Sequence, residues 1–234
     1  MKRTSLSDLE VLAYESTCLG MICLRRRKLL FEPGTVVTEI TLDHELLMSS
    51  CNTDSERALA SCALDMHEGS DLRVLVGGLG LGYTARELLR SDRVADVEVV
   101  EFLPQVIDWL DRGLVPLAGE LRADSRFSVS SGDVYVALSN PPERERDLIL
   151  VDVDHSPDER LGTASGSFYT EEGLESAKKH LAPDGVLGVW SYVESPPFAD
   201  ALREVFDEIR IEQRTFENRL IGEEETNWLF FARG

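Results

Sequence analysis

The spacing of hydrophobic positions sets the first 52 residues apart from the rest of the chain. Their apolar stretches are short, and charged or glycine-containing turns separate them: "LGMICL", "KLLFE", "TVVTEITL" and "HELLMSS". Short apolar runs bounded by turn residues are typical of strands. Residues 1–52 are therefore predicted to form a small antiparallel β-unit. The basic run "RRRK", residues 25–28, lies between two apolar stretches and is predicted to be the exposed tip of a hairpin.

A helix is predicted directly after this unit, in the segment "TDSERALASCALDMH". Thr53 and Glu56 have the spacing of a capping box, in which two side chains bond the free backbone N–H groups at a helix start. Apolar residues then recur at the spacing of one helix face. They are Ala58, Leu59, Cys62, Ala63 and Met66.

From Leu72 onward, apolar strands alternate with amphipathic helices. The predicted strands are "RVLVG", "VEVVE", "RFSVS", "RDLILVD" and "GVLGVW", and the helices lie near 82–90, 104–111, 170–182 and 196–206. This alternation predicts a parallel sheet with helices on both faces. Two last strands, near 208–216 and 226–232, are expected to pair as a hairpin, which reverses one of them. Residues 53–234 are thus predicted to form an α/β domain with a seven-stranded, mostly parallel sheet.

A glycine-rich stretch, "VLVGGLGLGYTARELL", joins the first of these strands to the next helix. In an open α/β sheet, ligands bind outside the carboxyl ends of the strands, and glycines let the backbone of such a turn approach the ligand. Gly78, Gly80 and Gly82 are therefore candidate ligand-binding residues. The alternative Gly80-x-Gly82-x-x-Ala85 spacing matches a dinucleotide fingerprint.

Acidic residues follow the next three strands. Glu101 closes the second strand, where a carboxylate can accept hydrogen bonds from both hydroxyls of a ribose. Asp133 opens a short helix, and its carboxylate either caps that helix, accepts from an adenine amine, or does both. Asp152, Asp154 and His155 end the apolar run "DLILVDVDH", where charged groups need a cation or a donor to face them.

Charge and composition narrow the function classes. The formal net charge is −19, which disfavours nonspecific nucleic-acid binding because phosphate contacts need Lys and Arg. No apolar run is long enough to cross a bilayer, and the start "MKRTSLSDLE" lacks the apolar core of a signal peptide, so a cytoplasmic protein without membrane partners is expected. The four cysteines form no CxxC pair and have no zinc spacing with the histidines, so no metal is expected.

The segments "VLVGGLGLG", "VEVVE", "GDVYVAL", "DLILVD" and "FYTEEGLESAKKHLAPDGVLGVWS", in this order, resemble the spermidine synthase family, the polyamine aminopropyltransferases. The resemblance implies a Rossmann-like domain of the class I methyltransferase type. It also implies decarboxylated S-adenosylmethionine as donor, a small amine as acceptor, a homodimer, and Asp152 as the catalytic acid/base. The residues that it implies for donor binding are Gly78, Gly80, Gly82, Glu101 and Asp133.

The chain departs from the family pattern on the amine side. Leu81 stands where the family usually has an acid inside the glycine turn, and His155, preceded by Asp154, stands where the family usually has a second Asp. Asp154 and His155 are predicted to bind the distal end of the acceptor, and His155 is alternatively a second proton acceptor. Three other functions stay open: a methyltransferase that uses ordinary S-adenosylmethionine, an oxidoreductase that uses the dinucleotide spacing, and a noncatalytic nucleoside-binding relative.

Overall fold

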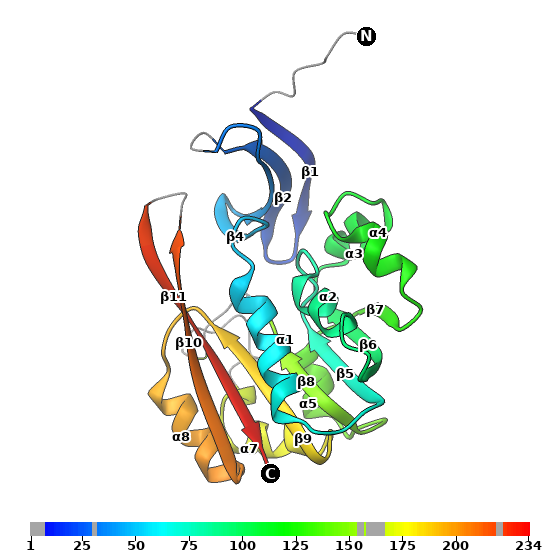
Figure 1. Cartoon of the computed structure of the whole chain (residues 1–234), viewed down its shortest axis with the longest axis vertical. Coiled ribbons are helices and arrows are strands. Elements are labelled where there is room, and N and C mark those ends of the chain that lie inside the picture. The colour runs from blue at the N-terminus through cyan, green and yellow to red at the C-terminus, as the bar shows by residue number, and fades with distance from the viewer. Residues whose placement is uncertain (1–7, 30–31, 154–156, 158–166, 219–221) are drawn as a thin grey trace.

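Two sheets make up the computed structural model, which describes residues 8–29, 32–153, 157, 167–218 and 222–234 (Figure 1). The smaller sheet is N-terminal and has the order β1-β2-β3-β4, with every neighbouring pair antiparallel. Its strands are β1 (Leu9–Thr17), β2 (Gly20–Lys28), β3 (Val36–Leu42) and β4 (Glu45–Ser49). The predicted antiparallel β-unit is therefore present, although β1 was not expected. The strand predicted over "KLLFE" was wrong in its described part, because only Lys28 belongs to a strand there.

The basic run does not form a hairpin tip, so that prediction was wrong. It lies inside β2, between β1 and β3. Arg25 and Arg27 both donate through Nε to the carboxylate of Glu39, at 2.9 and 2.8 Å. The Glu39 side chain is fully buried. Two guanidinium groups therefore neutralise a buried acid on the neighbouring strand, a pairing that the run of basic residues does not reveal by itself.

The larger sheet has seven strands in the order β10-β11-β9-β8-β5-β6-β7. All neighbours from β9 to β7 are parallel, whereas β11 is antiparallel to both β9 and β10. This arrangement confirms the predicted mostly parallel sheet with one reversed strand. The strands are β5 (Leu72–Gly77), β6 (Val94–Glu101), β7 (Phe127–Ser131), β8 (Arg146–Val151), β9 (Leu181–Ser191), β10 (Glu208–Asn218) and β11 (Glu223–Arg233).

Helices cover both faces of the larger sheet, as the alternation predicts. One face packs against α1 (Asp54–Met66), α2 (Tyr83–Leu89), α3 (Pro104–Asp111) and α4 (Ala118–Ala123). The other packs against α5 (Val134–Ser139), α7 (Glu171–Lys178) and α8 (Pro196–Val205). The helix predicted over 170–182 ends earlier, because Leu181 already pairs with Arg146 of β8.

Side chains of β8 show how the sheet is buried. Leu148 and Leu150 join the core on the α1 side, whereas Ile149 and Val151 join the core on the α8 side. All four are fully buried, which explains the continuous apolar run in the sequence.

The N-terminal sheet is attached to the same core on the α1 side. Ile22 and Ile40 pack into it, and Trp109 of α3 donates through Nε1 to the Glu15 carboxylate of β1 at 2.8 Å. Figure 1 shows this small sheet above one end of the larger sheet. The contact between the two sheets encloses the site described below.

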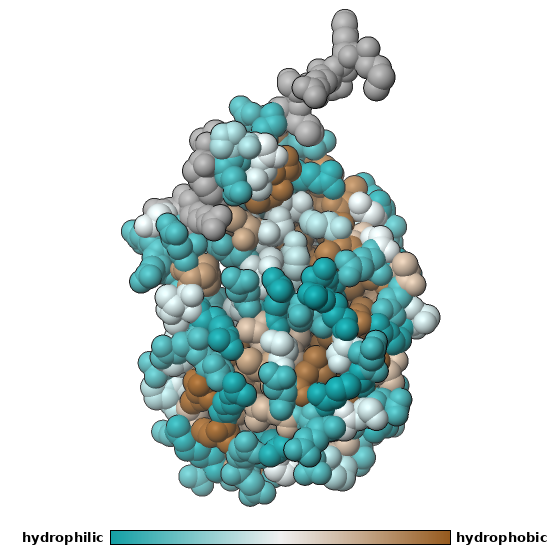
Figure 2. All heavy atoms as spheres, in the orientation of Figure 1, coloured by the Kyte–Doolittle hydropathy of each residue, from teal (hydrophilic) through white to brown (hydrophobic). Residues whose placement is uncertain are grey.

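Hydrophilic residues cover most of the face shown in Figure 2, with smaller groups of hydrophobic residues between them. Such a surface agrees with a formal net charge of −19. In the part of the chain that the structure describes, no helix is both long enough and apolar enough to span a membrane.

Candidate active site

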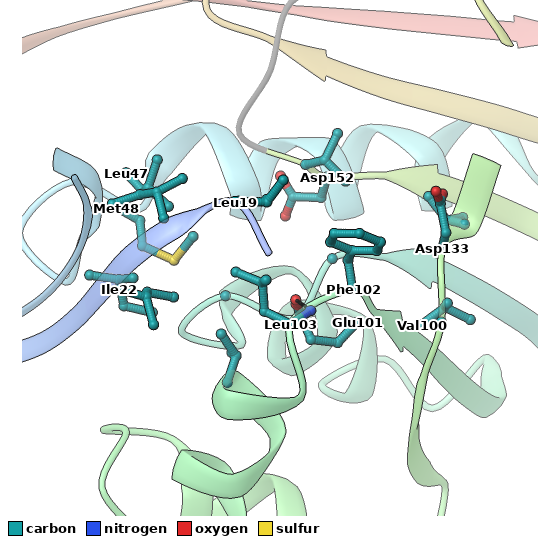
Figure 3. Close-up of a pocket in the computed structure, with 18 of the residues that line it drawn as sticks. Leu19, Ile22, Leu47, Met48, Val100, Glu101, Phe102, Leu103, Asp133 and Asp152 are labelled. Carbon is teal, nitrogen blue, oxygen red and sulfur yellow. Dashed lines mark hydrogen bonds between the residues drawn. The ribbon is translucent and has the colours of Figure 1, made fainter. Parts of the chain in front are cut away.

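A cavity of about 350 Å³ lies between the N-terminal sheet and the carboxyl ends of the central strands; we call it the main cavity. Its apolar wall comes largely from the N-terminal sheet and the turn before β2, and Figure 3 shows part of that wall facing the acidic residues. The wall includes Leu19, Ile22, Ile40, Leu42, Leu47 and Met48. The acidic residues are Glu101, Asp133 and Asp152. The structure thus brings three separately predicted acids to one cavity, as expected for the ends of adjacent parallel strands.

The glycine turn lies against this cavity. Gly78 has a φ of 96°, and a Cβ built there would lie 2.1 Å from the carbonyl oxygen of Asp152. Only glycine allows β5 and β8 to end this close together. Gly78 and Gly80 line the main cavity, whereas Gly82 lies at the start of α2 and lines a smaller neighbouring hollow. Two of the three predicted glycines therefore face the main cavity.

Glu101 ends β6 with its carboxylate held by the backbone. Oε2 accepts from the Leu79 N–H at 2.7 Å, and Oε1 accepts from the Leu103 N–H at 2.8 Å. Burial raises the pKa of Glu101, and the backbone hydrogen bonds from Leu103 and Leu79 oppose this effect. The backbone N–H groups of Gly80 and Phe102 also lower this pKa, and Glu101 lines the main cavity, where its ionised oxygens can accept from a ribose diol.

Asp133 caps α5. Its Oδ1 accepts from the backbone N–H groups of Tyr135 and Val136, at 2.8 and 3.4 Å. The capping role is therefore confirmed. Because Asp133 also lines the main cavity, the cap leaves room for the second predicted role toward an adenine amine.

Asp152 follows β8 and lies between both hollows of the site. Its N–H donates to the Gly77 carbonyl at 2.8 Å, which continues the pairing of β8 with β5. Its carboxylate accepts a short hydrogen bond from the hydroxyl of Thr84, in the first turn of α2. Sequence reasoning missed Thr84, although its place two residues after the glycine turn was a usable signal. Asp154 and His155 lie outside the described residues.

The smaller hollow, which we call the side hollow, has a volume of about 50 Å³. It shares Leu47, Met48, Gly80 and Asp152 with the main cavity. The residues that line it alone are Glu56, Leu79, Leu81, Gly82, Tyr83 and Trp190. Three residues with polar groups that sequence analysis did not assign to the site, the carboxyl of Glu56, the phenol of Tyr83 and the indole of Trp190, therefore line it.

Glu56 does not form the predicted capping box with Thr53. The Thr53 side chain makes no capping hydrogen bond with the described residues, and Glu56 instead lines the side hollow. Its carboxylate accepts from the Ser55 hydroxyl at 2.8 Å. A hydrogen bond from the backbone N–H of Glu56 itself also lowers the pKa of this carboxyl group, so Glu56 lines the side hollow while it still bonds the first turn of α1.

Two further observations concern cofactors. Ala85 of the dinucleotide spacing is 2% exposed and belongs to the core beneath α2. Among the described residues, no group of three or more His, Cys, Asp or Glu side chains could hold a metal ion.

The sheet order, the reversed β11 and the glycine turn facing acidic strand ends define a Rossmann-like α/β protein of the methyltransferase type. Residues 55–202 match the family model "Spermine/spermidine synthase domain", so the chain belongs to this family. The resemblance inferred from the sequence motifs is confirmed.

Curated relatives carry matching names. "Polyamine aminopropyltransferase 2" of Streptomyces coelicolor is 37% identical over 123 residues, which are 52% of this chain and 22% of the relative. "Polyamine aminopropyltransferase" of Prochlorococcus marinus (strain MIT 9313) is 32% identical over 145 residues, which are 62% of this chain and 47% of the relative. The chain thus spans less than half the length of these two proteins.

Solved structures agree on the fold. A spermidine synthase in complex with the transition state analogue AdoDATO has a TM-score of 0.74 at 21% identity, over 95% of this chain and 73% of that one. The spermidine synthase from Thermotoga maritima has a TM-score of 0.71 at 21% identity, over 95% of this chain and 72% of that one. At this identity the likeness establishes the shared fold.

Proposed function

We propose that the protein transfers an aminopropyl group from decarboxylated S-adenosylmethionine to a small amine. The observation that carries this proposal is the gathering of Glu101, Asp133 and Asp152 around one cavity beside the glycine turn. Membership of the spermine/spermidine synthase family supports it, as do the names of the aminopropyltransferase relatives.

The nucleoside half of the donor suits the main cavity. Glu101 offers two fixed oxygens to the ribose hydroxyls, and the Oδ2 of Asp133 is available to the adenine amine. Gly78 and Gly80 let the donor lie against the backbone of the turn. The AdoDATO complex of a related spermidine synthase supports an adenosyl donor in this fold.

Asp152 is the proposed proton acceptor. A primary ammonium has a pKa near 10.4, so freeing its lone pair at pH 7 costs about 5 kcal/mol. A carboxylate at the point of attack receives that proton while the amine nitrogen attacks the carbon beside the sulfonium. The new bond is C–N, the bond that breaks is C–S, and its electron pair returns to sulfur to leave a neutral thioether.

Methyl transfer from ordinary S-adenosylmethionine is the second candidate. One observation favours it: Leu81, at the position where the family usually has an acid, is 3% exposed and lines the side hollow. An apolar residue there offers no charge to select the amine end of the decarboxylated donor.

The test compares the two donors with methylthioadenosine and reduced nicotinamide dinucleotide by thermal shift and calorimetry, followed by turnover with a panel of amines. Aminopropyl transfer predicts stabilisation by the adenosyl compounds and turnover with the decarboxylated donor alone. Asp152→Asn keeps donor binding but lowers transfer by 100-fold or more. Stabilisation by the dinucleotide alone, or undiminished transfer by Asp152→Asn, contradicts the proposal.

A further inference from the structure

The side hollow has the size of a substrate end rather than of a whole substrate. Its volume of about 50 Å³ exceeds the 10–15 Å³ or so that one water needs. It opens beside Asp152, which lines both this hollow and the main cavity. An acceptor whose nitrogen lies at Asp152 can therefore extend its far end into the side hollow.

Glu56 and Asp152 both line the side hollow, and Thr84 contacts both residues. The Thr84 hydroxyl bonds the Asp152 carboxylate and lies 3.3 Å from the carbonyl oxygen of Glu56. The described lining of the side hollow contains no Lys, Arg or His. A hydrogen-bond donor on the substrate therefore finds carboxyl oxygens but no competing cation there.

Trp190 contributes the opposite kind of group. It is 8% exposed, lines the side hollow, and its buried Nε1 has no hydrogen-bond partner among the residues that the structure describes. An indole N–H only donates, and burying it without a partner costs about 1–3 kcal/mol. A substrate atom with a lone pair removes this cost, whereas an ammonium has no lone pair to offer.

A second positive charge is poorly matched to this hollow. Burial raises the pKa of Glu56, which disfavours its charged form before a ligand binds. Leu47, Leu79 and Leu81 form much of the remaining wall. Moving an ammonium from water to such surroundings is costly, whereas a hydroxyl needs only one donor and one acceptor.

We propose that the side hollow binds the hydroxyl end of a compact amino alcohol. The hydroxyl donates to the Glu56 carboxyl group and accepts from the Trp190 Nε1–H, while the amine lies at Asp152. This assignment rests on the proposed function for the reacting end at Asp152. The hollow thereby favours an amino alcohol over a diamine of the same length.

Calorimetry tests the assignment without requiring turnover. 4-Aminobutan-1-ol, 1,4-diaminobutane and butylamine are titrated into the protein with and without saturating methylthioadenosine. We expect the amino alcohol to bind at least tenfold more tightly than the other two. Trp190→Phe keeps an aromatic side chain but removes the N–H, and should reduce this preference to about twofold. Glu56→Gln removes the carboxyl group, and the change in the preference for the amino alcohol measures the contribution of that group.

Trp228→Phe is the matched control, because Trp228 lies on the neighbouring strand and packs on the opposite face of the sheet. The Trp228→Phe variant should keep the full preference for the amino alcohol. Equal binding of all three amines, tighter binding of the diamine, no binding of any amine, or an unchanged preference in Trp190→Phe overturns the assignment. Aminopropyl transfer to the diamine, together with any of these results, leaves the proposed function standing. If methylthioadenosine does not bind, the proposed function is contradicted. The amine titrations without methylthioadenosine then still test the assignment of the side hollow.

Discussion

The hydroxyl of Thr84 donates a hydrogen bond to the carboxylate of Asp152, across 68 positions of the chain. Thr84 is 3% exposed, in the first turn of α2, and Asp152 follows β8. The bond orients the carboxylate that the proposed function assigns as the proton acceptor. Thr84 is therefore a positioning residue for the proposed proton acceptor.

Thr84→Val should lower kcat about tenfold while the affinity for methylthioadenosine changes less than twofold. The substitution removes the hydroxyl but keeps the shape of the side chain, so the carboxylate loses its orientation while the nucleoside cavity is unchanged. Thr84→Ser restores the hydroxyl and should recover most of kcat. Equal losses in kcat and in nucleoside affinity would instead indicate a purely structural role.

The affinity for a nucleoside should rise as the pH rises through the pKa of Glu101, which burial raises. Because burial raises this pKa above its unfolded value, the folded protein binds the proton more tightly. The stability contribution of Glu101 is therefore full below the unfolded pKa and is lost as the pH rises through the folded pKa. Ribose hydroxyls donate to the ionised form, so binding of the nucleoside offsets this loss.

Calorimetry with methylthioadenosine between pH 5 and 8 measures this effect. Glu101→Gln has no charge to titrate, so it should bind at least tenfold more weakly at pH 8 and lose the dependence attributed to Glu101. If Glu101→Gln keeps the full pH dependence of methylthioadenosine affinity, another group controls that dependence.

Gly78→Ala should destabilise the protein by about 2 kcal/mol or more, because the new Cβ meets the Asp152 carbonyl oxygen and the backbone has a positive φ. The turn must shift, so nucleoside binding should fall as well. Gly119→Ala in α4 is the control. Apart from the adjacent residues and the backbone of its own helix, no described atom lies within 4 Å of its added Cβ, and alanine favours a helix by up to about 1 kcal/mol. Urea unfolding compares the two variants, and similar stabilities would refute the close-approach argument.

Glu39→Gln should lower the free energy of unfolding by about 2–3 kcal/mol, because two guanidinium groups lose their shared buried acid. Nucleoside binding should weaken too, since Ile40, the next residue of β3, lines the main cavity. Glu45→Gln, at an exposed position of β4, should change stability by less than about 0.5 kcal/mol. Chemical denaturation of both variants measures the free energy of unfolding. An equal loss of stability in Glu45→Gln would contradict the stabilising role of the buried Glu39.

The parallel sheet could be predicted because β8 is apolar on both faces and alternates with amphipathic helices, a pattern typical of a strand that helices cover on each side. The acids Glu101 and Asp152 could be found for a related reason. Glu101 ends β6 and Asp152 directly follows β8, and the carboxyl ends of neighbouring parallel strands meet at one edge of the sheet. The glycines between them predicted where a ligand could approach the backbone.

The residue pattern along a single segment did not predict which of two alternative partners a side chain would have. Arg25 and Arg27 have the composition of an exposed turn, but a buried Glu39 on the adjacent strand holds them inside the sheet. Glu56 has the spacing of a capping box with Thr53, but its carboxylate bonds Ser55 and the residue lines the side hollow. In each case the outcome depends on which element packs opposite, and residue spacing along one element does not contain that information.

The sequence by itself determined the alternation of strands and helices from Leu72 onward, the glycine turn and the acids at the strand ends, because these follow from periodicity and from residues adjacent along the chain. Only the tertiary structure decided that Thr84 orients Asp152, that the N-terminal sheet supplies the apolar wall, and that Glu56 and Trp190 share the side hollow. Those relationships join residues far apart in the chain, and burial and packing select them.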